Sequence, residues 1–186
     1  MGRGFTRAQN MDWKAIVSRL KTFSPRHEAY IETLLRDIVE HYGDRLLVCA
    51  VFGSYARREN RLNSDLDLFL ILDAKEGFTQ RMARFVEHIE MKLDPLAQEL
   101  YEREGILCEP SPYILMRDEA RFVHPIYYDL VEYHVIVHDP HGLMDRIVRG
   151  VKAHLAESGA RKEAVGTGWL WDVTGAKILK MLELGS

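Results

Sequence analysis

Hydrophobic positions in the first third of the chain follow two periodicities. Apolar residues recur every three or four positions and predict helices over about 12–21 and from Ser24-Pro25 to Gly43. Residues 45–52 and 65–72 are instead nearly continuous apolar runs, which indicate buried strands. Between these runs, residues 54–59 have the pattern of a short helix, and residues 62–64 that of a turn.

The remaining two thirds continue the alternation of helices and strands. Residues 77–104 are helical in pattern, with an interruption expected at Asp94-Pro95 because proline disrupts a helix interior. Further elements are predicted along the chain in this order: a strand at 113–116, a longer strand at 126–138, a helix at 141–156, a loop at 159–168, and a last strand or docking tail at 169–173.

Strands joined by helical segments predict an α/β (α+β) fold with a mixed sheet. We expect the helices to pack mainly on one face of the sheet and to leave the other uncovered. Residues 1–11 are predicted to be a flexible lead, 12–158 the folded domain, and 159–186 a C-terminal loop and tail that packs on the domain or on a partner.

Composition narrows the functional classes. A formal net charge of −3 argues against a nucleic-acid backbone as the main partner, since such proteins carry a cationic surplus. Only Cys49 and Cys108 are present, without a paired motif, which favours a reduced, cytoplasmic compartment. No apolar run reaches the roughly 20 residues that a membrane span requires.

The candidate chemistry lies between the two apolar runs. Gly53-Ser54 follows the first, and Asp65 and Asp67 stand at the head of the second. Side chains alternate along a strand, so the two carboxylates should share a face. Their mutual repulsion calls for a raised pKa or a hard cation such as Mg²⁺. A glycine turn that cradles phosphate beside such a pair is typical of phosphoryl or nucleotidyl transfer.

Residues 52–57 (Phe-Gly-Ser-Tyr-Ala-Arg) and 64–68 (Ser-Asp-Leu-Asp-Leu) resemble the signature of the DNA-polymerase-β-type nucleotidyltransferases. Within that superfamily they are most similar to the small minimal nucleotidyltransferases (the MNT group, antitoxin-like partners of HEPN proteins). Residues 125–131 resemble the later family strand that brings a third catalytic carboxylate, here Asp129.

The resemblance implies a nucleotidyltransferase-like fold and transfer of a nucleoside monophosphate, AMP from ATP, to an acceptor hydroxyl. It implies Asp65, Asp67 and Asp129 as catalytic and metal ligands for two Mg²⁺ ions, with Mn²⁺ as a substitute, and Gly53 and Ser54 as nucleotide-binding residues. It also implies a HEPN-domain toxin as partner in a toxin–antitoxin module.

One position departs from the family pattern, because Arg58 stands where a glycine is common. The arginine either alters the turn or adds a cation for the triphosphate. Two alternatives to the main hypothesis stay open: a non-catalytic nucleotide-binding, antitoxin-like subunit, and a transferase for small molecules of the aminoglycoside type. The acceptor, the base preference and the oligomeric state are not encoded in any pattern that we recognise.

Overall fold

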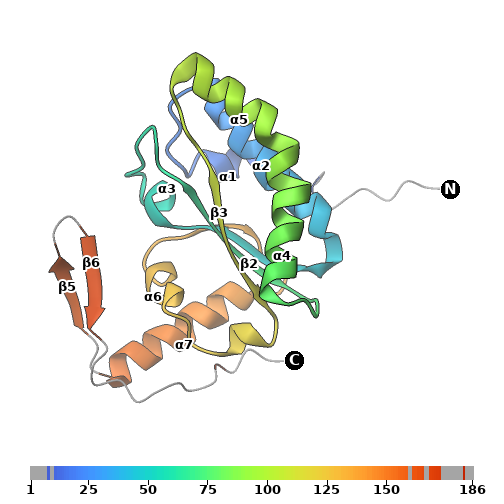
Figure 1. Cartoon of the computed structure of the whole chain (residues 1–186). Coiled ribbons are helices and arrows are strands. Elements are labelled where there is room, and N and C mark those ends of the chain that lie inside the picture. The colour runs from blue at the N-terminus through green and yellow to red at the C-terminus, as the bar shows by residue number, and fades with distance from the viewer. Residues whose placement is uncertain (1–7, 9–10, 159–160, 166–167, 173–181, 183–186) are drawn as a thin grey trace.

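A mixed four-stranded sheet forms the centre of the molecule (Figure 1). The computed structural model describes residues 8, 11–158, 161–165, 168–172 and 182. The strands of the central sheet lie in the order β3-β2-β1-β4, with bounds β1 Leu46–Val51, β2 Leu66–Leu72, β3 Pro110–Met116 and β4 Val135–His138. β1 pairs antiparallel with β2 and β4, whereas β2 and β3 are parallel.

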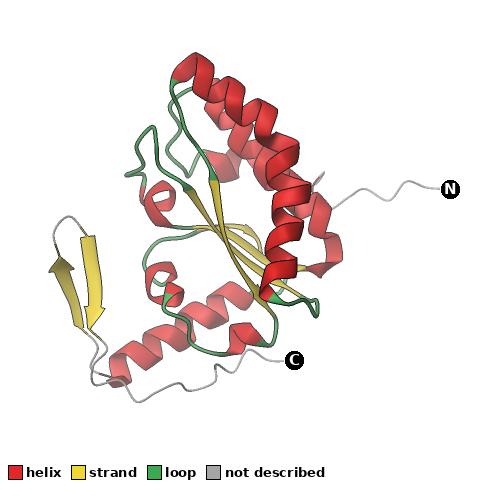
Figure 2. Cartoon of the chain, in the orientation of Figure 1, coloured by secondary structure: helices red, strands yellow, loops and turns green. Residues whose placement is uncertain are grey.

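Helices connect and cover these strands (Figure 2). Their bounds are α1 Trp13–Val17, α2 Pro25–Tyr42, α3 Gly53–Arg57, α4 Phe78–Phe85, α5 Met91–Glu104, α6 Ile126–Leu130 and α7 Leu143–Ser158, with a π-helical turn η3 at Val86–Glu90 and 3₁₀ turns η2 at Gly43–Arg45 and η4 at Glu119–Arg121. No helix in the described part of the chain is long and apolar enough to cross a membrane.

The predicted start and end of α2 are confirmed. The Ser24 side chain accepts a hydrogen bond from the His27 amide, and Pro25 occupies the first helical position, where its missing N–H costs nothing. At the other end Gly43 adopts φ +53°, a conformation that residues with a Cβ rarely take. α7 begins in a comparable way, because the Asp139 carboxylate accepts from the amides of Leu143 and Met144.

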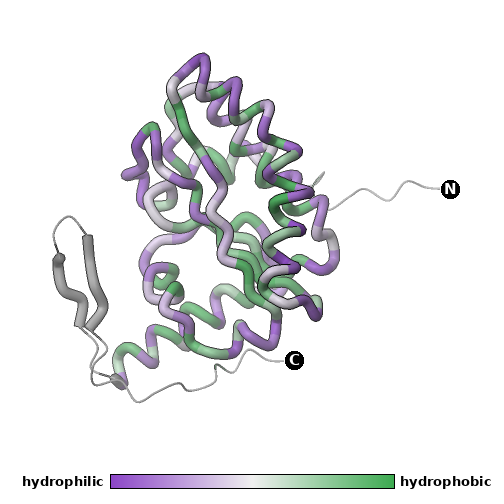
Figure 3. Tube along the Cα trace, viewed as in Figure 1, coloured by the Kyte–Doolittle hydropathy of each residue, from purple (hydrophilic) through white to green (hydrophobic). Residues whose placement is uncertain are grey.

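Hydrophobic residues predominate in the strands, which are largely green in Figure 3. Their side chains fill both faces of the sheet. Leu66, Leu68 and Leu70 pack on the side of α1, α2, α4 and α5. Phe69 and Ile71 face the opposite way, together with α6 and α7. The mixed-sheet class is therefore confirmed, but the second face is not uncovered as expected. Its apolar strand positions require a cover, and α7 supplies it.

Three predicted elements differ from the structure. Residues 126–138 do not form one long strand: the segment folds as α6, a turn and β4. Tyr127 and Leu130, three residues apart, are both fully buried, so helical spacing prevails over the alternation that suggested a strand. The predicted loop at 159–168 contains β5 Arg161–Val165, which pairs antiparallel with β6 Gly168–Asp172.

The third difference concerns the proline. The helical run does not break at Pro95, which lies inside α5. The irregularity occurs upstream as the π-helical turn η3, directly before Met91, the residue whose carbonyl oxygen the proline ring would otherwise strike. The expected lead at 1–11 and the tail beyond Asp172 lie mostly outside the described residues.

Candidate active site

The candidate site lies where β1 runs into α3, beside the first residues of β2. Gly53 is the first residue of α3 and adopts φ +65°. The Phe52 amide donates to the Asp67 carbonyl at 3.0 Å, which fixes this turn against β2. As predicted, β1 ends immediately before the glycine turn, and the turn opens a short helix.

Two features require glycine at position 53: its positive φ angle and the close approach of Asp67. A Cβ built on Gly53 would lie 2.0 Å from Asp67 Oδ2 and 2.9 Å from Asp67 Cγ. The glycine therefore makes room for a carboxylate of the protein itself. The prediction that a phosphate approaches this glycine concerns its backbone, whereas the space that a side chain would fill is occupied by the Asp67 carboxylate.

Asp67 projects from the face of the sheet that α6 covers, since its neighbours Leu66 and Leu68 face the other way. Burial, and then the charge of Asp65, raise the pKa of Asp67 to about 6; Asp129 adds to the rise and Arg57 opposes it. Asp65 and Asp129 thus both act electrostatically on Asp67, and Asp129 does so from a helix and not from the predicted strand.

The three carboxylates do not form a preformed metal site. Among the described residues, no group of three or more His, Cys, Asp or Glu side chains is close enough to hold a metal ion. Asp65, which directly precedes β2, and Asp129 are both exposed, whereas Asp67 is half-buried. Ser54 is half-buried, and its hydroxyl makes no hydrogen bond within the described part of the chain.

Arg58 adopts an unusual backbone conformation, and its side chain binds within the protein. It adopts φ 61° and ψ 28°, the left-handed conformation that glycine adopts far more readily than other residues. Its guanidinium donates to the carbonyl oxygens of Ser18 and Leu20, at 3.0 and 3.2 Å. The side chain thus ties the loop after α3 to the end of α1, and it is not directed to a triphosphate. A nearby pair of bonds between Lys21 and Asn60 reinforces the same junction.

A chain of buried hydrogen bonds supports α3 from beneath. The Phe23 amide donates to His27 Nδ1, so His27 Nε2 carries the proton toward Tyr55 Oη, 3.1 Å away. Tyr55 Oη donates in turn to Cys108 Sγ at 3.2 Å. Burial lowers the pKa of His27 to about 4, against the opposing charge of Glu104, so the ring is neutral at physiological pH.

Pairing of β2 with β3 adds candidates that the sequence did not reveal. Ser111 lies opposite Asp67 in the parallel register, and the carbonyl of Glu109 accepts from the Leu66 amide at 2.8 Å, next to Asp65. Arg57 is a further candidate, because its charge lowers the pKa of Asp67 and it also pairs with Glu59 at 2.9 Å. Only strand register, which no local pattern encodes, could have identified Glu109 and Ser111.

Comparison with known proteins agrees with the motifs. Residues 34–100 match the family model described as "Polymerase beta, Nucleotidyltransferase". Comparison with curated proteins gave no match.

Among solved structures, similar chains come from a toxin–antitoxin complex with AMP-PNP and from two mutants of the toxin–antitoxin MntA-HpeT. The first is 15% identical over 70% of this chain and 91% of its own. The mutants are 13% and 17% identical, over 70% and 71% of this chain and 91% of each of theirs. The TM-score is 0.40 in all three cases.

The matched residues include the glycine turn, Asp65 and Asp67, and the sheet has the mixed topology that the order of elements predicted. Residues 34–100 of this chain are therefore similar to the nucleotidyltransferases of the polymerase-β type.

Proposed function

We propose that this protein transfers a nucleoside monophosphate, AMP from ATP, to an acceptor hydroxyl, with Asp65, Asp67 and Asp129 as the metal-binding and catalytic carboxylates and Gly53 and Ser54 as nucleotide-binding residues. The observation that carries the proposal is the position of the Asp67 carboxylate against Gly53. A side chain at Gly53 would collide with the Asp67 carboxylate, and burial together with the charges of Asp65 and Asp129 raises the pKa of Asp67 to about 6.

The donor set fits Mg²⁺. The half-buried Asp67 carboxylate offers the oxygen ligands that Mg²⁺ prefers, and the charge of Arg57 offsets only part of the effect of burial and of Asp65 and Asp129 on it. Water and phosphate oxygens would supply the remaining ligands. When bound, Mg²⁺ would neutralise phosphate charge and lower the pKa of the attacking hydroxyl.

The remaining tasks fall to the chain itself. The unpartnered hydroxyl of Ser54 is available to donate to a phosphate oxygen. Arg57 supplies positive charge beside Asp67, and it can exchange its exposed pairing with Glu59 for a phosphate group at little cost. The hydrogen-bonded support under Tyr55 keeps α3, and with it Gly53 and Ser54, in place.

We further propose that the chain belongs with the minimal nucleotidyltransferases, acts in the cytoplasm, and takes a HEPN-type protein as acceptor in a toxin–antitoxin module. The signature at 52–57 and 64–68 supports the grouping. Cys49 and Cys108 are both free and buried, which agrees with a reducing compartment.

A transfer assay tests the proposal. The full-length protein is incubated with ATP labelled at the α-phosphate and Mg²⁺, with and without the product of an adjacent gene. We expect label on the partner and release of pyrophosphate, both abolished by EDTA. Absence of transfer, together with nucleotide affinity that does not respond to Mg²⁺, would instead identify a non-catalytic binding subunit.

A further inference from the structure

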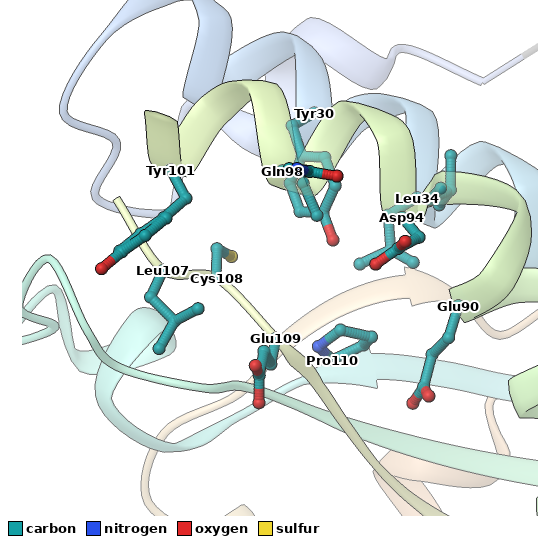
Figure 4. Close-up of a pocket in the computed structure, with 12 residues that line it drawn as sticks. Tyr30, Leu34, Glu90, Asp94, Gln98, Tyr101, Leu107, Cys108, Glu109 and Pro110 are labelled. Carbon is teal, nitrogen blue, oxygen red and sulfur yellow. The ribbon is translucent and has the colours of Figure 1, made fainter. Parts of the chain in front are cut away.

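A second cavity lies between α2, α5 and the chain that enters β3, on the side of the sheet opposite to Asp67 (Figure 4). Its volume is about 320 Å³, at the small end of the roughly 300–1,000 Å³ range of ligand sites. The floor is apolar and consists of the side chains of Leu34, Leu93, Ala97, Cys108 and Pro110.

Three carboxylates line this apolar space: Glu90, Asp94 and Glu109. None of them takes part in an ion pair within the described residues, although ion pairs are frequent elsewhere on the same helices. Burial, and then the charge of Glu109, raise the pKa of Glu90, which shows that the two negative charges act on each other. The cavity therefore carries negative charge that the fold itself does not neutralise.

Tyr30 provides an independent observation. Its side chain is only 4% exposed, yet its hydroxyl makes no hydrogen bond within the described part of the chain. In Figure 4 this hydroxyl points from α2 into the space above Pro110, between Cys108 and Asp94. The ring of Tyr30 is therefore buried while its hydroxyl remains open to the cavity, where it can exchange hydrogen bonds with a ligand. The ring of Tyr101 forms a second aromatic wall.

These features select the chemistry of the ligand. In Figure 4 the side chains of Glu90, Asp94 and Glu109 lie on different sides of the cavity and do not converge on one point, as the ligands of a single metal ion would. Carboxylates distributed around an apolar floor match several ammonium groups separated by methylene segments. The tyrosine hydroxyl and the carboxylates are hydrogen-bond acceptors, which favours primary or secondary ammonium over a quaternary one.

We propose that this cavity is a binding site for a small aliphatic polyamine. Glu90, Asp94 and Glu109 pair with the ammonium groups, and the hydroxyl of Tyr30 accepts a hydrogen bond from one of them. The methylene segments lie on Leu93, Ala97 and Pro110. Binding requires neither nucleotide nor metal, so it stands or falls separately from nucleotidyl transfer.

Isothermal titration calorimetry of spermidine into the full-length protein, without nucleotide or Mg²⁺, tests the proposal. We expect one site whose affinity falls with added salt. The double variant E90Q/D94N should bind at least about tenfold more weakly, as expected when hydrogen bonds to charged groups are lost. The matched double variant E87Q/D145N removes the same charge from exposed positions outside the cavity and should bind like the wild type.

Tyr30→Phe separates binding from structure. It removes only a hydroxyl without a protein partner, so the thermal midpoint should stay unchanged while spermidine affinity falls about threefold. Equal weakening in E87Q/D145N would reduce the effect to non-specific charge attraction and overturn the proposal. So would the absence of any binding, or equal affinity for tetramethylammonium or for an uncharged diol of similar length.

Discussion

Replacing Asp67 by asparagine should stabilise the metal-free protein while abolishing transfer. The isosteric change removes one charge from a group of three carboxylates and keeps the volume beside Gly53. The folded pKa of Asp67, about 6, lies above its ordinary value of 3.8, so the folded state holds the proton more tightly than the unfolded chain. Ionisation at higher pH therefore costs stability.

The magnitude follows from this shift. Two pKa units correspond to at most about 3 kcal/mol. Asp67 is only half-buried, and screening by solvent reduces the figure to on the order of 1 kcal/mol. At about pH 8 we expect the free energy of unfolding of Asp67→Asn to exceed that of the wild type by this amount, which raises the midpoint by about 2–4 °C. The difference should shrink as the pH falls through about 6 and vanish below about 4, where the wild-type carboxyl is also neutral.

Urea unfolding at a series of pH values, with and without Mg²⁺ and ATP, measures this effect. Ligand binding should stabilise the wild type and not the variant, so their order reverses when both ligands are present. Asp118→Asn is the control, because Asp118 is exposed and its side chain makes no capping bond. A variant that transfers AMP normally, or that is less stable than the wild type at high pH without metal, would refute our assignment of Asp67.

Three further predictions concern the scaffold. Gly53→Ala should lower the free energy of unfolding by about 1–3 kcal/mol, because residue 53 has a left-handed backbone conformation. It should also displace the Asp67 carboxylate, which a crystal structure would show, and lower kcat. A variant with full activity would contradict the inferred contact between residue 53 and Asp67. Arg58→Ala should lower the free energy of unfolding by about 1–3 kcal/mol, because it loses two hydrogen bonds and keeps the strained backbone. Arg58→Gly should recover about 1 kcal/mol of that loss, because glycine adopts the left-handed conformation without strain. Thermal unfolding that ranks the alanine variant at or above the glycine variant would exclude this explanation. Burial lowers the pKa of His27 from 6.5 to about 4 in the folded state, so its contribution to the free energy of unfolding is complete above pH 6.5 and is lost as the pH falls to about 4. His27→Gln should therefore be less stable at neutral pH, and its stability should not show this decline in acid. An unchanged pH profile would argue against a buried neutral imidazole.

Local pattern was sufficient to predict where several candidate residues lie in the fold. Gly53, Ser54, Asp65 and Asp67 could be placed because each lies next to a strong apolar strand, where alternation fixes the direction of the side chains. The same pattern misled for residues 126–138, because Tyr, Val and Ile suit a strand as well as a buried helical turn, and only packing against β2 selects the helix that carries Asp129.

The sequence by itself determined the order of most of the main elements, the pair of aspartates and the glycine turn before them. What only the tertiary structure decided is which groups meet. The contact of Gly53 with Asp67, the approach of Asp129 from α6, and the position of Ser111 opposite Asp67 all join residues far apart in the chain. Strand register and helix packing create these contacts, and both depend on how the whole core fills its volume and not on the nearest neighbours of any residue.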